Sequence, residues 1–231
     1  MEITPGLSTF SILILGFLLG LRHATDADHL AAVSTIVSER KSLFSSAIVG
    51  GLWGIGHTIS LFVVGILVIF LKLQISPELE TKLEAIVGGM LVLLGINALY
   101  KLATAKEIHA HTHDHGERAH THLHLHKDEK EKAHHRFSPR SIIIGMVHGL
   151  AGSAALMLLV VPTIQSPWIA TMYILIFGLG SIGGMMLMSF IIGLPFHFTA
   201  TNFSFLNKAI RLCAALFSFG LGLNIIYEKL S

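Results

Sequence analysis

The first membrane-length apolar segment of the chain carries ionisable residues at its centre. The polar run is Arg-His-Ala-Thr-Asp-Ala-Asp-His, residues 22–29. The apolar stretch before it, residues 7–21, is shorter than the roughly 20 residues that a helix needs to cross about 30 Å of hydrocarbon, so the helix must continue into the polar run. A helix over residues 9–37 would have its midpoint near His23. An Arg or Asp at that depth costs about 2.5–3.5 kcal/mol, which predicts a functional site.

The composition predicts an integral membrane protein of the all-α class. Of the 231 residues, 52% are hydrophobic and 13% are charged, and the mean hydropathy is +0.70, which is more apolar surface than a soluble core of this size could bury. Hydropathy predicts six transmembrane helices, near residues 9–37, 46–71, 83–102, 141–163, 168–193 and 208–227.

Lysine and arginine predict how the protein lies in the cell membrane, because basic residues are held on the cytoplasmic side during insertion. They are dense in the first, third and fifth connections and sparse in the others. Both termini are therefore predicted to be extracytoplasmic, and the long central loop to be cytoplasmic. The net charge of +2 reflects this sidedness and gives no indication of nucleic-acid binding.

The two halves of the chain resemble each other weakly. Matching segments begin at Gly20 and Gly145, at Gly56 and Gly183, and at Gly95 and Gly222, with offsets of about 125 to 127 residues. Three spans per half would give the halves opposite orientations, and such inverted repeats place a substrate site near the membrane midplane. The predicted organisation is a three-helix half at 1–103, a His-rich loop at 104–137 and a second three-helix half at 138–231. The alternative is that Gly-rich apolar segments resemble each other by composition alone.

The polar run and two further histidines are candidate metal ligands. Imidazole and carboxylate together favour a first-row transition metal, and carboxylates balance its charge in a low dielectric. On an unbroken helix Asp28 points away from the other side chains, so a common site requires local unwinding or a partner helix. An Arg22–Asp26 ion pair that merely fixes a helix crossing is the structural alternative. The candidate ligands are His23, Asp26, Asp28, His29, His57 and His148.

The central loop is a second candidate metal site. Ten of the 15 histidines lie between His109 and His135, many at alternate positions. Flexible imidazoles of this kind bind divalent metals with little selectivity, which predicts a buffering role. The alternative is a spacer whose composition has drifted. The predicted loop ligands are His109, His111, His113, His115, His120, His122, His124 and His126.

Three motifs resemble the nickel/cobalt transporter family. Residues 20–30 contain a His-x4-Asp-His pattern at His23, Asp28 and His29, residues 53–58 resemble the family's second motif, and residues 145–156 are similar to its short urease accessory nickel permease branch. The resemblance implies a polytopic transporter that uses His23, Asp28, His29 and His57 at its metal site. The chain has six predicted spans, whereas larger members have eight.

The predicted function is secondary transport of nickel(II) or cobalt(II), with no resident cofactor and no enzymatic activity. The chain has no Walker-type phosphate loop. An inside-negative potential supplies about 2.3 kcal/mol per charge per 100 mV, so a divalent cation can enter without further coupling. The predicted partners are the ion, the bilayer and a cytoplasmic metallochaperone or a urease or hydrogenase maturation protein. The alternatives are an efflux permease, a membrane metal sensor and an intramembrane metalloenzyme.

Overall fold

The computed structural model of the chain is all-α over the residues that it describes, which are 8–40, 42–73, 76–104, 139–151 and 161–231. In chain order the elements are α1 (Thr9–His23), α2 (Ala27–Val37), α3 (Leu43–Leu71), α4 (Pro77–Thr104), α5 (Pro139–Ala151), the 3-10 helix η1 (Val161–Thr163), α7 (Pro167–Asn202) and α8 (Ser204–Leu230). The all-α class predicted from the sequence is therefore confirmed for this part of the chain. The central loop histidines lie outside it.

The first predicted span is broken at its polar run into α1 and α2, whose axes bend by 55°. α1 ends at His23, and both the amide and the hydroxyl of Thr25 donate to the carbonyl of Arg22, at 2.8 and 2.6 Å. Asp26 then takes an extended conformation as the residue before α2. Thr and Asp favour such helix ends because they bond locally to the backbone or tolerate the cap geometry. A continuous helix over 9–37 is thus not formed, and this is a correction to the sequence-based expectation.

Four helices, α3, α4, α7 and α8, are long and apolar enough to cross a membrane, and the bent α1–α2 pair would count as a fifth span. Each of the four contains the span predicted for it. The remaining predicted span, residues 141–163, is described only in part. α5 covers its beginning and η1 its end, while residues 152–160 lie outside the described residues.

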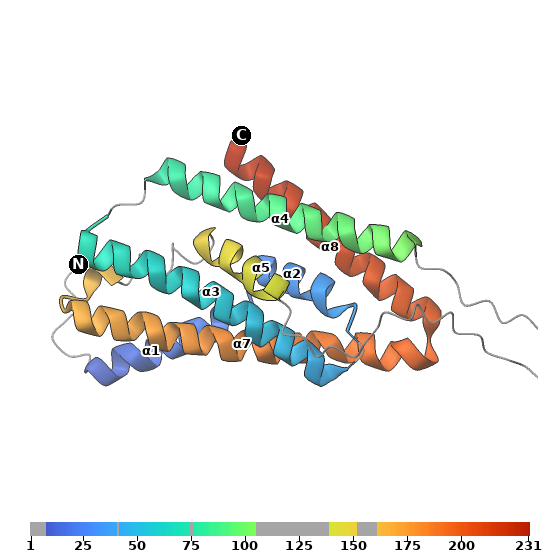
Figure 1. Cartoon of the computed structure of the whole chain (residues 1–231), viewed down its shortest axis with the longest axis horizontal. Helices are drawn as coiled ribbons and strands as arrows, with labels where there is room; N and C mark the ends of the chain where they lie inside the picture. Colours follow the sequence, from blue (N-terminus) through green and yellow to red (C-terminus); the bar gives the residue numbers. More distant parts are fainter. Residues whose placement is uncertain (1–7, 41, 74–75, 105–138, 152–160) are drawn as a thin grey trace, which may run out of the picture.

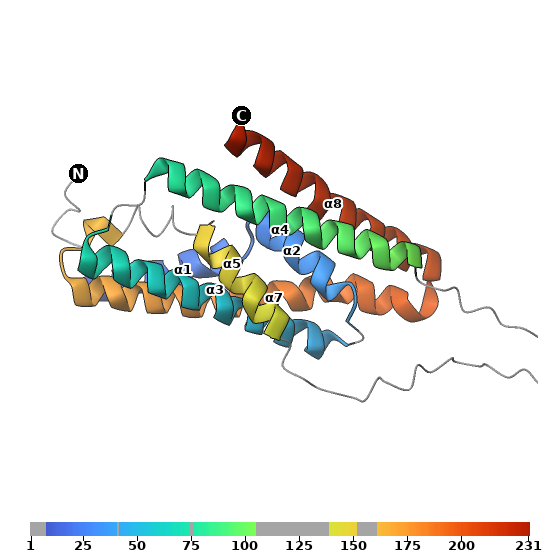
Figure 2. The ribbon, with the colours of Figure 1, turned by 45° about the horizontal axis from the view of Figure 1, so that its top comes forward.

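Helices from the two halves of the chain pack against each other. α3 lies along α7, α1 packs on α7, α5 packs on α3, and α4 lies along α8. The short helices α2 and α5 lie between the α3–α7 pair and the α4–α8 pair (Figures 1 and 2). This arrangement places the end of α1, the beginning of α2 and the end of α5 around the middle of α3.

Glycines allow close backbone contact at the helix crossings. At several positions a Cβ atom would meet the backbone carbonyl of another helix, so only glycine permits the approach, and four of these contacts are the closest. The four contacts join Gly20 to Phe177, Gly145 to Trp53, Gly56 to Ile142 and Gly180 to Phe17. The two α1–α7 contacts thus have counterparts between α5 and α3.

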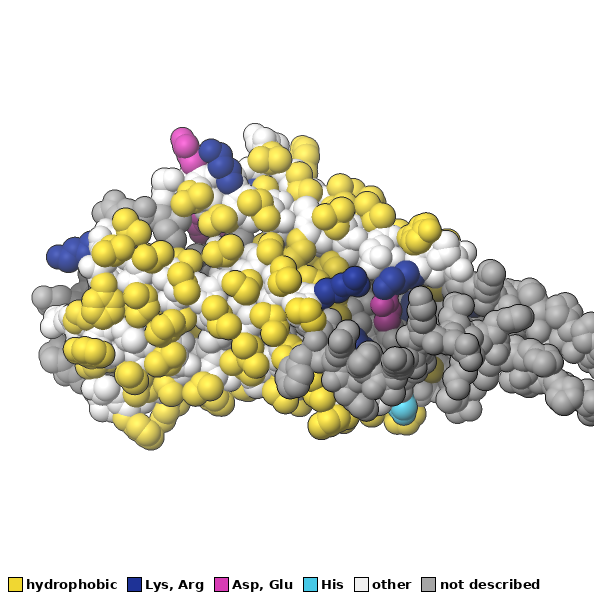
Figure 3. All heavy atoms as spheres, in the orientation of Figure 1, with side chains coloured by type: hydrophobic (Ala, Val, Ile, Leu, Met, Phe, Trp, Pro, Cys, Tyr) yellow, Lys and Arg dark blue, Asp and Glu magenta, His cyan; other side chains and the backbone are white. Residues whose placement is uncertain are grey.

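The surface is largely apolar. Hydrophobic side chains cover most of the face seen in Figure 3, and Leu93 and Leu179 are exposed by 69% and 59%. Basic residues gather at one end, where Arg40, Lys101 and Arg140 line a hollow. Lys101 pairs there with Glu39 at 2.7 Å. An apolar belt with a basic end fits a protein embedded in a bilayer.

Candidate metal site

Four histidines meet inside the helix assembly, and each is at most 2% exposed. His23 is the last residue of α1, His29 lies in the first turn of α2, His57 is in α3 and His148 is in α5. The break between α1 and α2 turns the chain between His23 and His29, so their rings face each other. Side chains from four separate elements therefore meet in one buried cluster.

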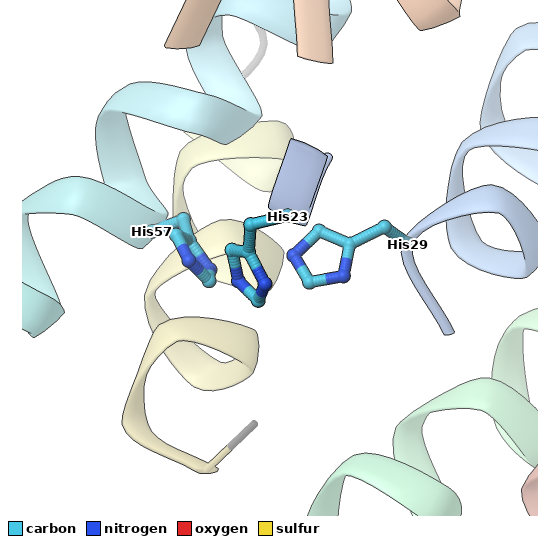
Figure 4. A group of neighbouring side chains, drawn as sticks. All are labelled: His23, His29 and His57. Carbon is cyan, nitrogen blue, oxygen red and sulfur yellow. The ribbon is translucent and has the colours of Figure 1, made fainter. Parts of the chain in front are cut away.

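The first group consists of three imidazoles, those of His23, His29 and His57. One candidate ligand atom from each lies within 4.8 Å of the others. Their ring centroids are 4.4 Å apart for His23–His29 and 5.2 Å apart for the other two pairs. Figure 4 shows the three rings side by side, with one nitrogen of His29 facing His23. All three side chains are buried.

The second group consists of Asp28, His29 and His148, which also meet the 4.8 Å criterion. Asp28 Oδ1 is 3.0 Å from His29 Nδ1, and its Oδ2 is 3.1 Å from His148 Nε2. His148 Nε2 is 3.3 Å from His29 Nδ1. Asp28 also accepts the backbone amide of His29 at 2.9 Å. His29 therefore belongs to both groups.

Several ring nitrogens in this cluster have no hydrogen-bond partner. His23 Nε2, His29 Nε2 and both nitrogens of His57 are buried and unpaired, as is His148 Nδ1. Buried polar atoms without partners are rare in proteins because each costs free energy, and they require an explanation. One such nitrogen from each of several neighbouring imidazoles is a donor set that suits a divalent transition metal.

Two aromatic side chains enclose the cluster. The ring of Trp53, which is fully buried, lies 5.2 Å from His29 and 5.3 Å from His148 between centroids. Phe177 of α7 lies 5.6 Å from His23. Neither residue is among the site residues predicted from the sequence. Trp53 could have been found because it is four residues before His57 and so shares its helix face.

Five of the six predicted ligands come together in these two groups. The sixth, Asp26, belongs to neither group and contacts only the outer nitrogen of His23 among the cluster residues. Asp26 Oδ2 is 2.7 Å from His23 Nδ1, and its side chain is 43% exposed. The structure thus pairs Asp26 with His23 rather than with Arg22. A carboxylate that holds the outer nitrogen of a ligating histidine fixes the ring and its tautomer.

The Asp26→Asn variant tests this positioning role. Loss of an outer-shell partner typically lowers metal affinity 10- to 100-fold, and the exposure of Asp26 favours the lower end, so we expect about a tenfold weaker affinity for nickel(II). An Asp26→Glu variant, which keeps the charge, should recover part of that affinity. Titration of the purified protein with nickel(II) measures both, and a 100-fold or greater loss in Asp26→Asn would instead make Asp26 a direct ligand.

Comparison with known proteins places these residues in a family context. The sequence matches the family described as high-affinity nickel-transport protein over residues 9–225. The urease accessory protein UreH of Bacillus sp. (strain TB-90) is 40% identical over 202 residues, which cover 87% of this chain and 85% of that protein. No solved structure matches the chain.

Two plant proteins are more distant relatives. The chloroplast proteins FOR GROWTH AND FERTILITY 1 and 2 of Arabidopsis thaliana are each 27% identical to the chain, over 213 and 216 residues. These matches cover 91% and 93% of this chain but 57% and 55% of the plant proteins. The chain therefore spans little more than half the length of these two relatives.

Proposed function

We propose that this chain, which belongs to the high-affinity nickel-transport protein family, moves nickel(II) or cobalt(II) into the cell through the buried histidine cluster. The membership confirms the resemblance predicted from the motifs, and the protein is a multi-pass membrane protein. The observation that carries the proposal is the convergence of four buried histidines and one carboxylate at a broken helix.

The position of the cluster supports transport rather than static binding. Its ligands come from α1, α2, α3 and α5, so small movements between these elements would change the coordination. Non-helical backbone at membrane depth is tolerated where it lines a protein-enclosed site, and discontinuous helices of this kind hold substrates in secondary transporters. An enzyme would need a reactive base or nucleophile beside the ion, and Asp28 is already engaged by two imidazoles.

We also propose that the chain consists of two inverted three-helix repeats joined by the loop at 104–137. The paired glycine contacts between α1 and α7 and between α5 and α3 support this. A two-fold axis between the repeats would map α1 onto α5 and α7 onto α3, and so would map one pair of contacts onto the other. A further contact fits the same relation. Ser218 donates to the carbonyl of Leu91 at 3.0 Å, and the two residues are 127 positions apart, which matches the offset of the last repeat segment.

The charge distribution supports an orientation with the basic end in the cytoplasm. Arg40, Lys101 and Arg140 share that end, from which the loop leaves α4 and returns to α5. Lys72 and Lys229 lie at the C-terminal ends of α3 and α8, away from the basic end, and Lys229 pairs there with Glu84. Both termini would then be extracytoplasmic, and the membrane potential would drive the cation inward.

The loop histidines from His109 to His126, which lie outside the described residues, would buffer the ion at the cytoplasmic mouth. A clustered set of imidazoles binds divalent metals weakly and reversibly. The name of the urease accessory relative suggests the next acceptor. We propose a urease maturation protein or a metallochaperone of similar chemistry as the cytoplasmic partner.

Purified protein in liposomes tests the proposed function. Nickel(II) is supplied outside, an inside-negative potassium diffusion potential is imposed, and the metal retained inside is measured. We expect accumulation that increases with the potential. In His23→Ala, nickel(II) uptake should fall to the level of liposomes that contain no protein. Removal of residues 107–135 should lower uptake without abolishing it, because none of the five cluster ligands belongs to that segment.

A matched control comes from a histidine outside the cluster. His197 is exposed on α7, so His197→Ala should transport like the parent protein. Binding without accumulation would contradict the transport proposal and favour a sensor. Loss of nickel only from preloaded liposomes would contradict the inward direction.

A further inference from the structure

His29 presents a different nitrogen to each of the two ligand groups. Its Nδ1 lies 3.0 Å from Asp28 Oδ1 and 3.3 Å from His148 Nε2. Its Nε2 is buried and without a hydrogen-bond partner. The His29 nitrogen that faces His23 in Figure 4 is this Nε2, because Nδ1 is engaged on the other side. The two groups thus meet the same ring from opposite edges.

A neutral imidazole can ligate through only one of these edges at a time. One ring nitrogen carries the proton and the other carries the lone pair. When Nε2 binds the ion, Nδ1–H can donate to Asp28, as metal-bound histidines commonly do. When Nδ1 binds the ion, the proton is on Nε2. Ligation through both edges would require an imidazolate and a second dication beside a single carboxylate, which is unfavourable in a buried site.

We propose that the cluster provides two overlapping positions for one divalent cation, which are used alternately and share His29. The tri-histidine position consists of His23, His29 and His57. The carboxylate position consists of Asp28, His29 and His148. This inference rests on the proposed function and specifies how the ion advances through its site. His29 carries one proton in both states: as the ion passes to the carboxylate position, the Nδ1–H bond breaks and an Nε2–H bond forms, with water as the proton carrier, so the number of protons does not change.

The exposure of the ligands orders the two positions. The side chains of His23 and His29 are at most 1% exposed, whereas that of Asp28 is 22% exposed. The carboxylate position is therefore the one next to the surface of the protein, and the tri-histidine position is enclosed. Each position holds the ion by only two ligands of its own in addition to His29, which allows exchange without complete release.

Trp53 can report on both positions, because its ring lies 5.2 Å from His29 and 5.3 Å from His148. The chain has one other tryptophan, Trp168, which is 72% exposed at the start of α7. A full-length Trp168→Phe protein therefore emits from Trp53 alone. Titration with nickel(II) chloride should quench this emission saturably.

The variants then separate alternating positions from a single site. In the Trp168→Phe protein, we expect His57→Ala and His148→Ala each to retain saturable quenching with about tenfold weaker affinity, because the other position still binds. His29→Ala should lose quenching, and so should the double variant His57→Ala/His148→Ala. Both single variants should nevertheless lose transport in liposomes, because the ion must use both positions. Size-exclusion profiles matched to the parent exclude misfolding.

The number of bound ions provides the second measurement. The ten loop histidines are replaced by asparagine in the full-length chain, and cobalt(II) is counted by native mass spectrometry at saturation. One ion per chain supports alternation, and two ions overturn it. Loss of quenching in His57→Ala and in His148→Ala as complete as in His29→Ala also overturns it, in favour of one undivided site. Absence of quenching in the parent protein instead overturns the proposed metal site itself.

Discussion

Replacement of Asp28 by asparagine is expected to reduce nickel uptake at least about 100-fold. Loss of an outer-shell partner already lowers metal affinity or activity 10- to 100-fold, and a direct ligand should exceed that range. Asp28 is the only carboxylate in the two ligand groups, and it contacts both His29 and His148. Asparagine keeps the shape of the side chain but removes the charge that offsets the dication in a low dielectric.

Asp26→Asn is the matched control for Asp28→Asn, because the same chemical change is made two residues away. Asp26 contacts His23 from outside the cluster and is 43% exposed, so its loss should cost only about tenfold. Uptake into liposomes at a fixed membrane potential measures both variants. Equal effects of the two substitutions would contradict the assignment of Asp28 as the ligand and Asp26 as the positioning residue.

The residues of the candidate site could be proposed from the sequence because ionisable side chains are costly to bury in lipid. Ionisable side chains at the centre of an apolar segment require a function, and this argument alone singled out residues 22–29. The weak sequence resemblance between the two halves added His148, which lies 119 residues from His29 but contacts it at 3.3 Å. Spacing on one helix could not have made that connection.

The different roles of Asp26 and Asp28 could not be predicted from the sequence. On a continuous helix Asp26 shares a face with His23 and His29, and Asp28 points elsewhere. The turn at Thr25 changes this, because it directs Asp28 toward His29 and His148 and leaves Asp26 behind His23. The sequence indicates that a common site requires unwinding of the helix, but it does not locate the turn.

The extent of the long helices followed from hydropathy, whereas their packing did not. α3, α4, α7 and α8 contain the predicted spans because apolar runs of this length have few alternatives in a membrane. Which helices touch depends on where small residues allow close approach. The sequence offset pairs Gly56 with Gly183, whereas in the structure the contact of Gly56 with Ile142 is like that of Gly180 with Phe17.

Replacement of Gly145 by alanine is expected to destabilise the protein and to disrupt the metal site together. A Cβ atom at Gly145 would lie against the carbonyl oxygen of Trp53 and 2.8 Å from its Cδ1. The backbone of α3 cannot yield as a flexible side chain would, so α5 must move away. Overpacking of this kind costs about 1–3 kcal/mol. His148 is one turn further along α5 and would move with it, away from His29.

Gly220 of α8 supplies the control for Gly145→Ala, because nothing lies within 4 Å of a Cβ atom placed there. Alanine is favoured over glycine in a helix by about 1 kcal/mol, so Gly220→Ala should be neutral or stabilising. Thermal unfolding in detergent measures both, and each kcal/mol corresponds to a shift of roughly 2–4 °C for a chain of this size. Gly145→Ala should lower the midpoint and reduce quenching of Trp53 by nickel(II). A lower midpoint with unchanged quenching would show that the α3–α5 contact supports the fold without positioning His148.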